Sequence, residues 1–316
     1  MKKKINILIT GCGGDIGQSI GKILLNSNYT LNLFGVDITD KNPAQFIYPN
    51  FSIGLRCDNP KYLESLEFFI NKHRIDLLIP VSESEIRFFS INNILNNVLN
   101  AKILIASSLA LEVGLDKYRT FEFLKNESLP YPKTKLAKDL LNIEEFPVIL
   151  KLRTGSGSKQ IFKINTFEEF VFFTKNSKSN FIVQEYISDE CGEFTCGLFR
   201  SRQGEIRSQI FKRELAGGYS GFGEVVKNNA IKLLLERLAV KLDLIGSINV
   251  QLRLNKNIPI IFEINPRFSS TVLFRHLLGF EDLIWSIQDN FGLELSNYHE
   301  NAIGKKFFKG FQEYIK

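Results

Sequence analysis

One carboxylate and two side-chain amides stand where neighbouring strands could bring them together. Gln251 ends the apolar run that begins at Ile248, and Glu263 and Asn265 close the run that begins at Ile258. Because side chains alternate along a strand, Glu263 and Asn265 face the same side. Mg²⁺ prefers such oxygen ligands and fills its other positions with phosphate and water. The spacing therefore predicts a metal site formed by Gln251, Glu263 and Asn265.

Arg267 follows two residues after Asn265, in the sequence Asn265-Pro-Arg267. A guanidinium at this position could hold a phosphoryl or carboxylate oxygen with two hydrogen bonds. The alternative is a polar turn after a strand, since Asn-Pro commonly starts one. A glutamate after the apolar run 258–262 needs a partner if it is buried, which favours the functional interpretation.

A lysine and a glycine- and serine-rich loop form a candidate phosphate grip. Lys151 ends an apolar strand, and the loop that follows contains small residues whose backbone N–H groups could approach phosphate oxygens: Gly155, Ser156, Gly157 and Ser158. The loop lies between two predicted strands and opens no helix, so it would act as a flap. Lys117 is a second candidate phosphate ligand. The alternative is a hairpin with solvated lysines.

The strand 181–187 offers a third candidate, a platform for a purine base. Its end could present backbone groups of Glu185 and Ile187 to a base edge, and Tyr186 and Ile187 could supply apolar faces. Glu193, after the turn, could bind ribose hydroxyls. Each residue alone is equally consistent with a buried strand and an edge glutamate.

The elements that must position these residues differ between the two parts of the chain. Up to about residue 110, apolar strands at 5–10, 31–37 and 75–81 alternate with helical segments, which predicts a doubly wound α/β domain. From residue 109 a helical region to 126 precedes strands in neighbouring runs. These runs predict an α+β arrangement with antiparallel sheets.

Composition narrows the class of protein. The 316 residues carry a formal charge of +6. The sequence contains no basic stripe interleaved with aromatic residues, which is the pattern that would indicate nucleic-acid binding. Four cysteines form no Cys-x-x-Cys pair and no zinc pattern. No apolar run approaches the length of a membrane span. We expect a cytoplasmic protein without nucleic-acid or membrane partners.

The order of these motifs resembles the ATP-grasp superfamily, most closely its carbamoyl-phosphate-synthase-like branch. The resemblance implies a Rossmann-like pre-ATP-grasp domain at 1–110 and a two-lobed ATP-grasp domain at 111–316. The small flap-bearing lobe would span about 120–186, and the large metal-binding lobe about 187–316.

The resemblance also implies a role for each candidate residue. Lys117 and Lys151 would contact the phosphates of ATP, and the glycine- and serine-rich loop would cover them. Glu185 and Ile187 would present backbone to adenine, and Glu193 would take the ribose. Gln251, Glu263 and Asn265 would hold two Mg²⁺ ions, or Mn²⁺, beside the catalytic Arg267, and Arg213 falls where relatives keep a substrate-facing basic residue.

The implied activity is that of an ATP-dependent ligase. A small carboxylate would be activated as an acyl phosphate and coupled to an amine. Both substrates would be small molecules, and the protein could be a homodimer. Specificity is expected from the loops at 11–17 and 82–87, from the segment 214–223 and from residues near Arg275.

The sequence also supports an alternative activity. Gly11-Cys-Gly-Gly-Asp-Ile-Gly17 follows a strand, and Asp37 lies twenty residues further on, as in a dinucleotide-binding fingerprint. The second hypothesis is therefore an NAD(P)-dependent short-chain-type oxidoreductase or epimerase. The absence of a Tyr-x-x-x-Lys pair argues against it. A third hypothesis is a non-catalytic ATP-binding module.

Overall fold

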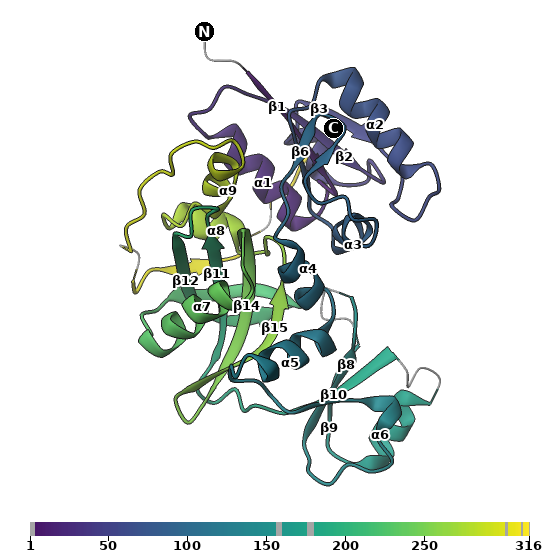
Figure 1. The fold of residues 1–316 in the computed structure, drawn as a ribbon, viewed down its shortest axis with the longest axis vertical. Coiled ribbons are helices and arrows are strands. Elements are labelled where there is room, and N and C mark those ends of the chain that lie inside the picture. Colours follow the sequence, from purple (N-terminus) through teal and green to yellow (C-terminus); the bar gives the residue numbers. More distant parts are fainter. Residues whose placement is uncertain (1–3, 156–159, 176–179, 301–302, 311, 316) are drawn as a thin grey trace.

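A computed structural model describes residues 4–155, 160–175, 180–300, 303–310 and 312–315. Three sheets succeed one another along the longest axis of the molecule (Figure 1). The first lies at the top of that view, the largest in the middle, and a small four-stranded sheet at the bottom.

The first sheet has the strand order β3-β2-β1-β4-β6-β5 and is parallel except for the β5–β6 pair. Its strands are β1 (Ile5–Thr10), β2 (Leu31–Asp37), β3 (Asn50–Ile53), β4 (Leu77–Pro80), β5 (Asn97–Val98) and β6 (Ala101–Ile103). Its helices are α1 (Asp15–Leu25), η1 (Pro43–Phe46), α2 (Tyr62–His73) and α3 (Glu83–Ile91).

Helices cover both faces of this sheet because β1 is apolar on both sides. Ile7 and Ile9 pack with Ile20 of α1 on one face. Leu8 packs with Leu66 of α2 on the other. The predicted doubly wound domain is confirmed in its architecture.

Two helices connect the first sheet to the rest: α4 (Ser108–Gly114) and α5 (Lys117–Asn126). The sequence predicted one helical region from 109 to 126. The helical region is interrupted before Asp116, because the Asp116 side chain caps a new helix. It accepts from the backbone N–H groups of Tyr118 at 2.9 Å and Arg119 at 3.3 Å.

The small sheet is antiparallel, with the order β7-β10-β8-β9. Its elements are β7 (Thr134–Leu136), η2 (Ala137–Asp139), β8 (Val148–Leu152), β9 (Ile161–Ile164), α6 (Phe167–Thr174) and β10 (Phe181–Glu185). Leu150, Ile164 and Phe170 belong to a core cluster of its own, so this part is a separate lobe.

The largest sheet is antiparallel, with the order β15-β14-β11-β12-β13-β16. Its strands are β11 (Glu193–Arg200), β12 (Ile206–Ala216), β13 (Tyr219–Val225), β14 (Gly246–Asn255), β15 (Ile258–Asn265) and β16 (Lys306–Phe308). Its helices are α7 (Asn229–Lys241), α8 (Val272–Leu277) and α9 (Asp282–Asn290).

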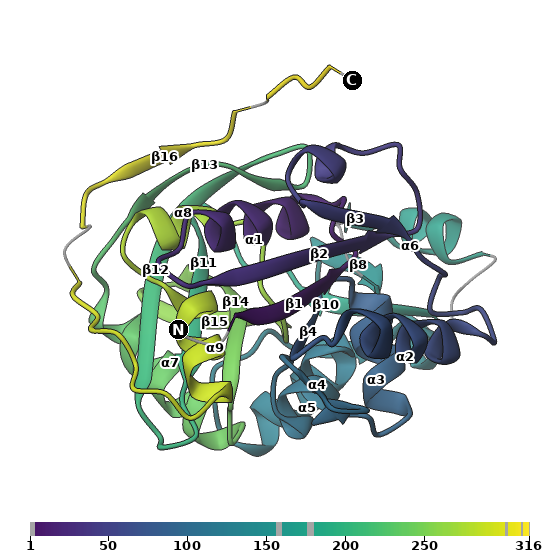
Figure 2. The ribbon, with the colours of Figure 1, turned by 90° about the horizontal axis from the view of Figure 1, so that it is seen from above.

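The first and largest sheets share a core, which fixes their relative position. Val272 of α8 and Leu283 of α9 belong to the same buried cluster as Ile7 and Ile20. Figure 2 shows α8 beside α1. The expected division at residue 110 stays a prediction. Among the described helices, none combines the length and the apolar character needed to cross a bilayer.

Candidate active site

The strands β14 and β15 bring the predicted metal ligands together. Gln251 lies opposite Glu263, and Asn249 lies opposite Asn265. All four residues line a cavity of about 840 Å³. The predicted convergence of Gln251, Glu263 and Asn265 is therefore present, although their role as ligands stays a prediction.

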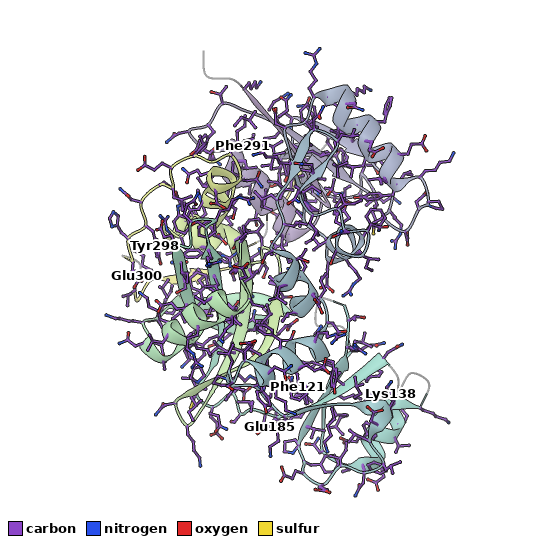
Figure 3. All side chains as sticks on the ribbon, in the orientation of Figure 1. Phe121, Lys138, Glu185, Phe291, Tyr298 and Glu300 are labelled. Atoms are coloured by element: carbon purple, nitrogen blue, oxygen red, sulfur yellow. The ribbon has the colours of Figure 1, made fainter. Side chains whose placement is uncertain are left out.

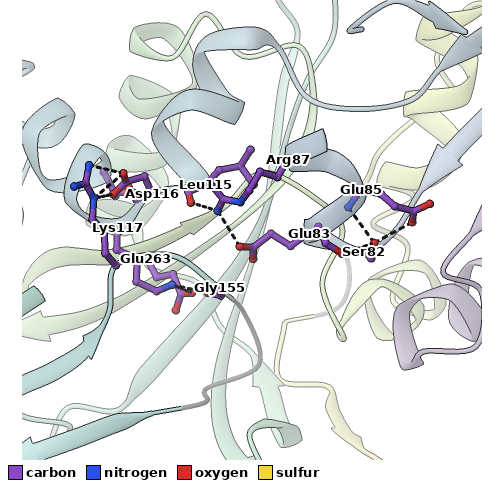
Figure 4. A network of polar contacts seen from close by, with 12 residues as sticks. Ser82, Glu83, Glu85, Arg87, Leu115, Asp116, Lys117, Gly155 and Glu263 are labelled. Atoms are coloured by element: carbon purple, nitrogen blue, oxygen red, sulfur yellow. Dashed lines mark hydrogen bonds and ion pairs between the residues drawn. The ribbon is translucent and has the colours of Figure 1, made fainter. Parts of the chain in front are cut away.

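Two lysines approach Glu263 from other elements. Lys117, the first residue of α5, places Nζ 3.9 Å from Glu263 Oε1 and donates to the carbonyl of Gly155 at 2.8 Å. Lys151 on β8 is 3% exposed and donates to the carbonyl of Phe262 at 3.1 Å. Three separate elements thus deliver two ammonium groups and one carboxylate to the same place (Figure 4 labels Lys117, Gly155 and Glu263).

Burial sets the protonation of Lys151. Removal from water lowers its pKa to about 8, with the nearby Lys117 acting in the same direction and Glu263 acting against it. A buried ammonium with one carbonyl partner has hydrogen-bond donors to spare, so an additional anion would be strongly favoured there.

The start of the expected flap is anchored, and its centre lies outside the described residues. Arg153, at the end of β8, forms an ion pair with Asp116 at 2.8 Å. Thr154 and Gly155 line the large cavity. Ser156, Gly157 and Ser158 are outside the described residues.

A network of charges surrounds Glu193 on β11. Its Oε1 accepts from Arg213 at 2.8 Å and its Oε2 from Arg253 at 2.8 Å. Arg213 also donates to Gln251 Oε1 at 2.9 Å. These contacts link the expected ribose ligand to the expected metal ligand through one guanidinium. Arg213 lines the cavity, in agreement with its expected position.

The expected base platform lies where the small lobe meets the largest sheet. Figure 3 labels Glu185, at the end of β10. Its backbone N–H donates to the carbonyl of Lys133 at 2.8 Å, and its carboxylate accepts from Lys133 N at 3.0 Å. The carbonyl of Ile187 accepts from Arg253 at 2.7 Å. The Tyr186 ring carries Lys163 Nζ 4.1 Å from its centroid.

Arg267 lines the cavity at the end of β15 and donates to the carbonyl of Phe268 at 2.9 Å. Burial lowers its pKa, and the nearby carboxylates of Glu83 and Glu263 oppose that shift. Residues near Arg275 were expected to contribute to specificity, but Arg275 itself is not accessible. Arg275 is fully buried and paired with Asp282 at 3.0 Å, so it cannot touch a substrate in the cleft.

Three residues at the site were not singled out from the sequence. Asn249 faces Asn265, and a signal existed because it stands two residues before Gln251. Arg253, two residues after Gln251, gave the same signal. The Phe262 ring lies between two cations, 5.6 Å from Lys151 Nζ and 5.8 Å from the Arg253 guanidinium. Its position depends on long-range strand pairing, which no local pattern revealed.

The first sheet supplies the opposite wall of the cavity. Gly11 and Asp15 line it from the glycine-rich loop, and Ser82 and Glu83 line it from the start of α3. Glu83 accepts from Arg87 at 3.3 Å, and Arg87 also contacts the carbonyl of Leu115 (Figure 4). Gly217, Gly218 and Tyr219 also line the cavity, and the role of the segment 214–223 in specificity stays a prediction.

Two features of the glycine-rich loop that a dinucleotide would need are already occupied. Asp37 accepts from the backbone N–H of Gly13 at 2.7 Å and of Ile38 at 2.8 Å. A Cβ on Gly13 would meet Asn42 at 2.5 Å, so this side chain fills the space above the loop. A dinucleotide fingerprint needs that carboxylate for the ribose and that space for pyrophosphate.

The oxygen donors of β14 and β15 suit a hard divalent cation. Glu263 is the carboxylate of the set, and Gln251, Asn249 and Asn265 supply amide oxygens. Within the part of the chain that the structure describes, no group of three or more His, Cys, Asp or Glu residues is placed to hold a metal. A metal at this site would therefore depend on oxygens of its nucleotide.

Comparisons with known proteins agree with this geometry. Residues 115–271 match the ATP-grasp domain family. An uncharacterized protein of Mycoplasma genitalium, MG011, is 31% identical over 94 residues, which are 29% of this chain and 32% of that protein. A probable alpha-L-glutamate ligase of Shewanella loihica is 23% identical over 213 residues, covering 61% of this chain and 68% of that protein.

A solved structure supports the fold over nearly the whole chain. N5-carboxyaminoimidazole synthetase from Staphylococcus aureus, complexed with ADP, superposes with a TM-score of 0.74 at 17% identity. The match covers 94% of this chain and 80% of that chain. The resemblance noted from the sequence is thereby confirmed: residues 115–271 of this chain are an ATP-grasp domain.

Proposed function

We propose that this protein is an ATP-dependent ligase that activates a small carboxylate as an acyl phosphate and couples it to an amine. The observation that carries the proposal is the approach of Lys117 and Lys151 to Glu263, which lines the large cavity. The ATP-grasp domain and similarity to a probable alpha-L-glutamate ligase support the same activity.

The residues divide the work of holding ATP. Lys117 and Lys151 contact the phosphates, and the loop from Gly155 covers them. The backbone near Glu185 and Ile187 faces adenine. Ile187 can use its N–H, because its carbonyl is already held by Arg253. Glu193 accepts four N–H groups from Arg213 and Arg253, so a ribose hydroxyl would bind it by displacing one of these donors.

Gln251, Glu263 and Asn265 would hold Mg²⁺, as two ions or with Mn²⁺ in their place. When bound, the metal neutralises charge on the transferring phosphoryl group. With Glu263 as the carboxylate in this set, much of the remaining coordination falls to phosphate oxygens and water. The protein's part is to fix three oxygens on two paired strands before the nucleotide arrives.

The reaction then proceeds in two steps. An oxygen of the substrate carboxylate attacks the γ-phosphorus, the bond to the β-phosphate oxygen breaks, and ADP leaves. The amine nitrogen attacks the acyl carbon, the carbon–oxygen bond to phosphate breaks, and the amine loses a proton. Arg267 holds the phosphoryl oxygens, and Arg213 stands on the substrate side of the cavity. A closed flap excludes water from the acyl phosphate.

The proposed organisation follows from these roles. Residues 1–110 form the pre-ATP-grasp domain, whose loops at 11–17 and 82–87 face the substrates. Residues 120–186 form the small lobe, and residues 187–316 form the metal-binding lobe.

Trapping the intermediate tests the proposal. Hydroxylamine converts an acyl phosphate into a hydroxamate, so we expect ADP and hydroxamate in equal amounts when the correct carboxylate is supplied with ATP and Mg²⁺. A panel of amino acids and small dicarboxylates would identify that carboxylate. The variant Glu263→Ala is the control and should form neither product. NAD⁺-dependent turnover without ADP would favour the oxidoreductase hypothesis instead.

A further inference from the structure

A second cavity adjoins the first at the carboxyl edge of the first sheet. Its volume is about 300 Å³, and it lies between the ends of β1, β2 and β3 and the helix α2. Gly11, Ser82 and Ser84 line both cavities, so the two share a wall. A molecule that reacts in the large cavity could therefore extend an arm into the small one.

Two carboxylates line this second cavity. Glu85 is 8% exposed and accepts from the Tyr62 hydroxyl at 2.7 Å and from the Ser82 hydroxyl at 2.9 Å. Asp37 accepts from the backbone N–H of Gly13, in the glycine-rich loop, and from that of Ile38. In Figure 4 Glu83 points toward Arg87 in the large cavity, whereas Glu85 points away on the other side of Ser82.

These carboxylates lack a buried cationic partner. Among the described residues that line the cavity, the single cation is Arg56. Its side chain is 66% exposed and is paired with Asp58 at 3.0 Å, so it lies in solvent at the rim. Burial raises the pKa of Glu85, and the neighbouring Asp37 raises it further against the hydrogen bonds of Tyr62 and Ser82. A carboxylate in this position is stabilised by a cation that the protein itself does not supply.

A further polar group beside Glu85 is available to a ligand. Thr10, at the end of β1, is 3% exposed and lines the cavity. Its hydroxyl makes no well-formed hydrogen bond among the described residues, although it lies close enough to Glu85 to lower the pKa of that carboxyl. Buried hydroxyls are rarely left in this state unless water or a ligand completes them.

One side of the cavity is apolar. Leu8, Val36, Leu66 and Phe69 form the wall on the side of the sheet and α2. This combination of an apolar wall with buried carboxylates at one end selects for a molecule with the same two features. Anions are disfavoured there, because they would face Asp37 and Glu85.

We propose that this cavity binds an ammonium group carried on an apolar arm of a substrate of the proposed ligase. The ammonium lies against Glu85 and Thr10, and the arm packs on Leu66 and Phe69. The reacting group of the same molecule lies in the large cavity beside Arg267. The inference rests on the proposed function and names a chemical class for one of its substrates, a basic amine with an aliphatic chain.

Binding measurements with matched pairs of compounds test the inference. L-lysine, L-ornithine and 1,5-diaminopentane serve as cationic ligands. L-norleucine is the control for lysine, because its side chain lacks the terminal ammonium group. Calorimetric titration of the full-length protein with ATP present should give tighter binding for at least one cationic compound. In Glu85→Gln that preference should fall about 10- to 100-fold, because a neutral amide replaces the charge.

A second variant leaves the carboxylates intact. Ser65 lies on the exposed side of α2 and lines the cavity. Ser65→Phe should fill the space and abolish binding of the cationic compounds, whereas Ser65→Ala should bind them as the wild type does. This pair decides the question if Glu85→Gln fails to fold.

The inference is overturned if all three cationic compounds bind no better than L-norleucine, or if Ser65→Phe binds them normally. Stabilisation by ATP and Mg²⁺ is measured in the same samples. If that stabilisation persists while the cationic preference is absent, only the inference fails. If ATP with Mg²⁺ stabilises neither the wild type nor Ser65→Phe, the proposed function fails as well.

Discussion

Two regions were candidate binding sites in the sequence, the glycine-rich loop after β1 and the predicted metal site on β14 and β15. They differ in the folded molecule. After β1, the glycine-rich loop contacts other residues of the protein. Asp37 accepts a hydrogen bond from the backbone N–H of Gly13, and the Asn42 side chain fills the space above Gly13. Within β14 and β15, Gln251 and Glu263 line a cavity, and two lysines lie near Glu263.

The difference shows that a motif acts through the donors and acceptors that remain available. Both regions combine a strand end, small or polar residues and a carboxylate. In the first region the carboxylate already accepts two backbone N–H groups. In the second, the Lys151 ammonium donates to the carbonyl of Phe262 and is almost fully buried. Only the second region gains from a polyanionic ligand.

The largest expected effect comes from removing the charges of the second region. Lys151→Ala and Glu263→Ala should each lower the rate of ADP release by about 100-fold or more, because each removes a preorganised contact to the triphosphate or its metal. Lys232→Ala is the matched control, since Lys232 is exposed and paired with Glu300 far along the chain. Turnover within twofold of wild type in either variant would break the contrast between the two regions.

Removing the metal should also lower the rate of ADP release. A chelator should stop ADP release, and Mg²⁺ should restore it. Because Glu263 is the single carboxylate of the paired set, Mg²⁺ without nucleotide should bind only weakly, at roughly millimolar concentrations. Titration calorimetry with and without ADP measures this. Tight binding of Mg²⁺ to the protein alone would point to a different ligand set.

The pH dependence of ATP binding tests the state of Lys151. Its pKa in the folded protein is lowered to about 8, so the ammonium is present below that pH and lost above it. The Kd for ATP should therefore increase as pH rises through about 8, by at most about tenfold per pH unit.

Stability should change in the opposite direction over the same window. Between about 8 and the ordinary lysine pKa, the unfolded chain binds a proton at Lys151 that the folded chain does not. This term makes the free energy of unfolding increase with pH. In Lys151→Ala both pH effects should disappear, and an unchanged pH profile in that variant would assign them to another group.

The smallest expected effect comes from the first region. Asp37→Asn weakens two hydrogen bonds to the backbone and should lower the free energy of unfolding by about 1 kcal/mol. The Kd for ATP should not change. Chemical denaturation and ATP titration of the same variant measure both quantities. A variant that folds normally but loses NAD⁺ binding would instead show that Asp37 serves a dinucleotide.

Local sequence patterns predicted strands and helices well where a single signal, such as an apolar run, decides the bounds of the element. The bounds of β1 and β2 agree with the apolar runs that indicated them. The helical region expected at 109–126 contains two helices, because Asp116 caps the second one. That signal was present in the sequence, since aspartate is a preferred residue at the start of a helix.

The site was predictable only as far as strand alternation reaches. Alternation placed Glu263 and Asn265 on one face, and strand pairing added Asn249 and Gln251. The bridge from Arg213 to Glu193 and Gln251 joins residues 20 and 38 positions apart, so no local pattern contains it. The ion pair of Arg275 with Asp282 joins α8 to α9, so it too depends on tertiary packing that no local pattern contains.

Thermal denaturation with competing ligands tests the central claim most directly, namely that a triphosphate binds between Lys151 and Glu263. ATP with Mg²⁺ at 100 times its Kd should stabilise the folded protein by about 2.7 kcal/mol and raise Tm, and NAD⁺ and NADP⁺ should leave Tm unchanged. The account is contradicted if NAD⁺ or NADP⁺ raises Tm while ATP with Mg²⁺ does not.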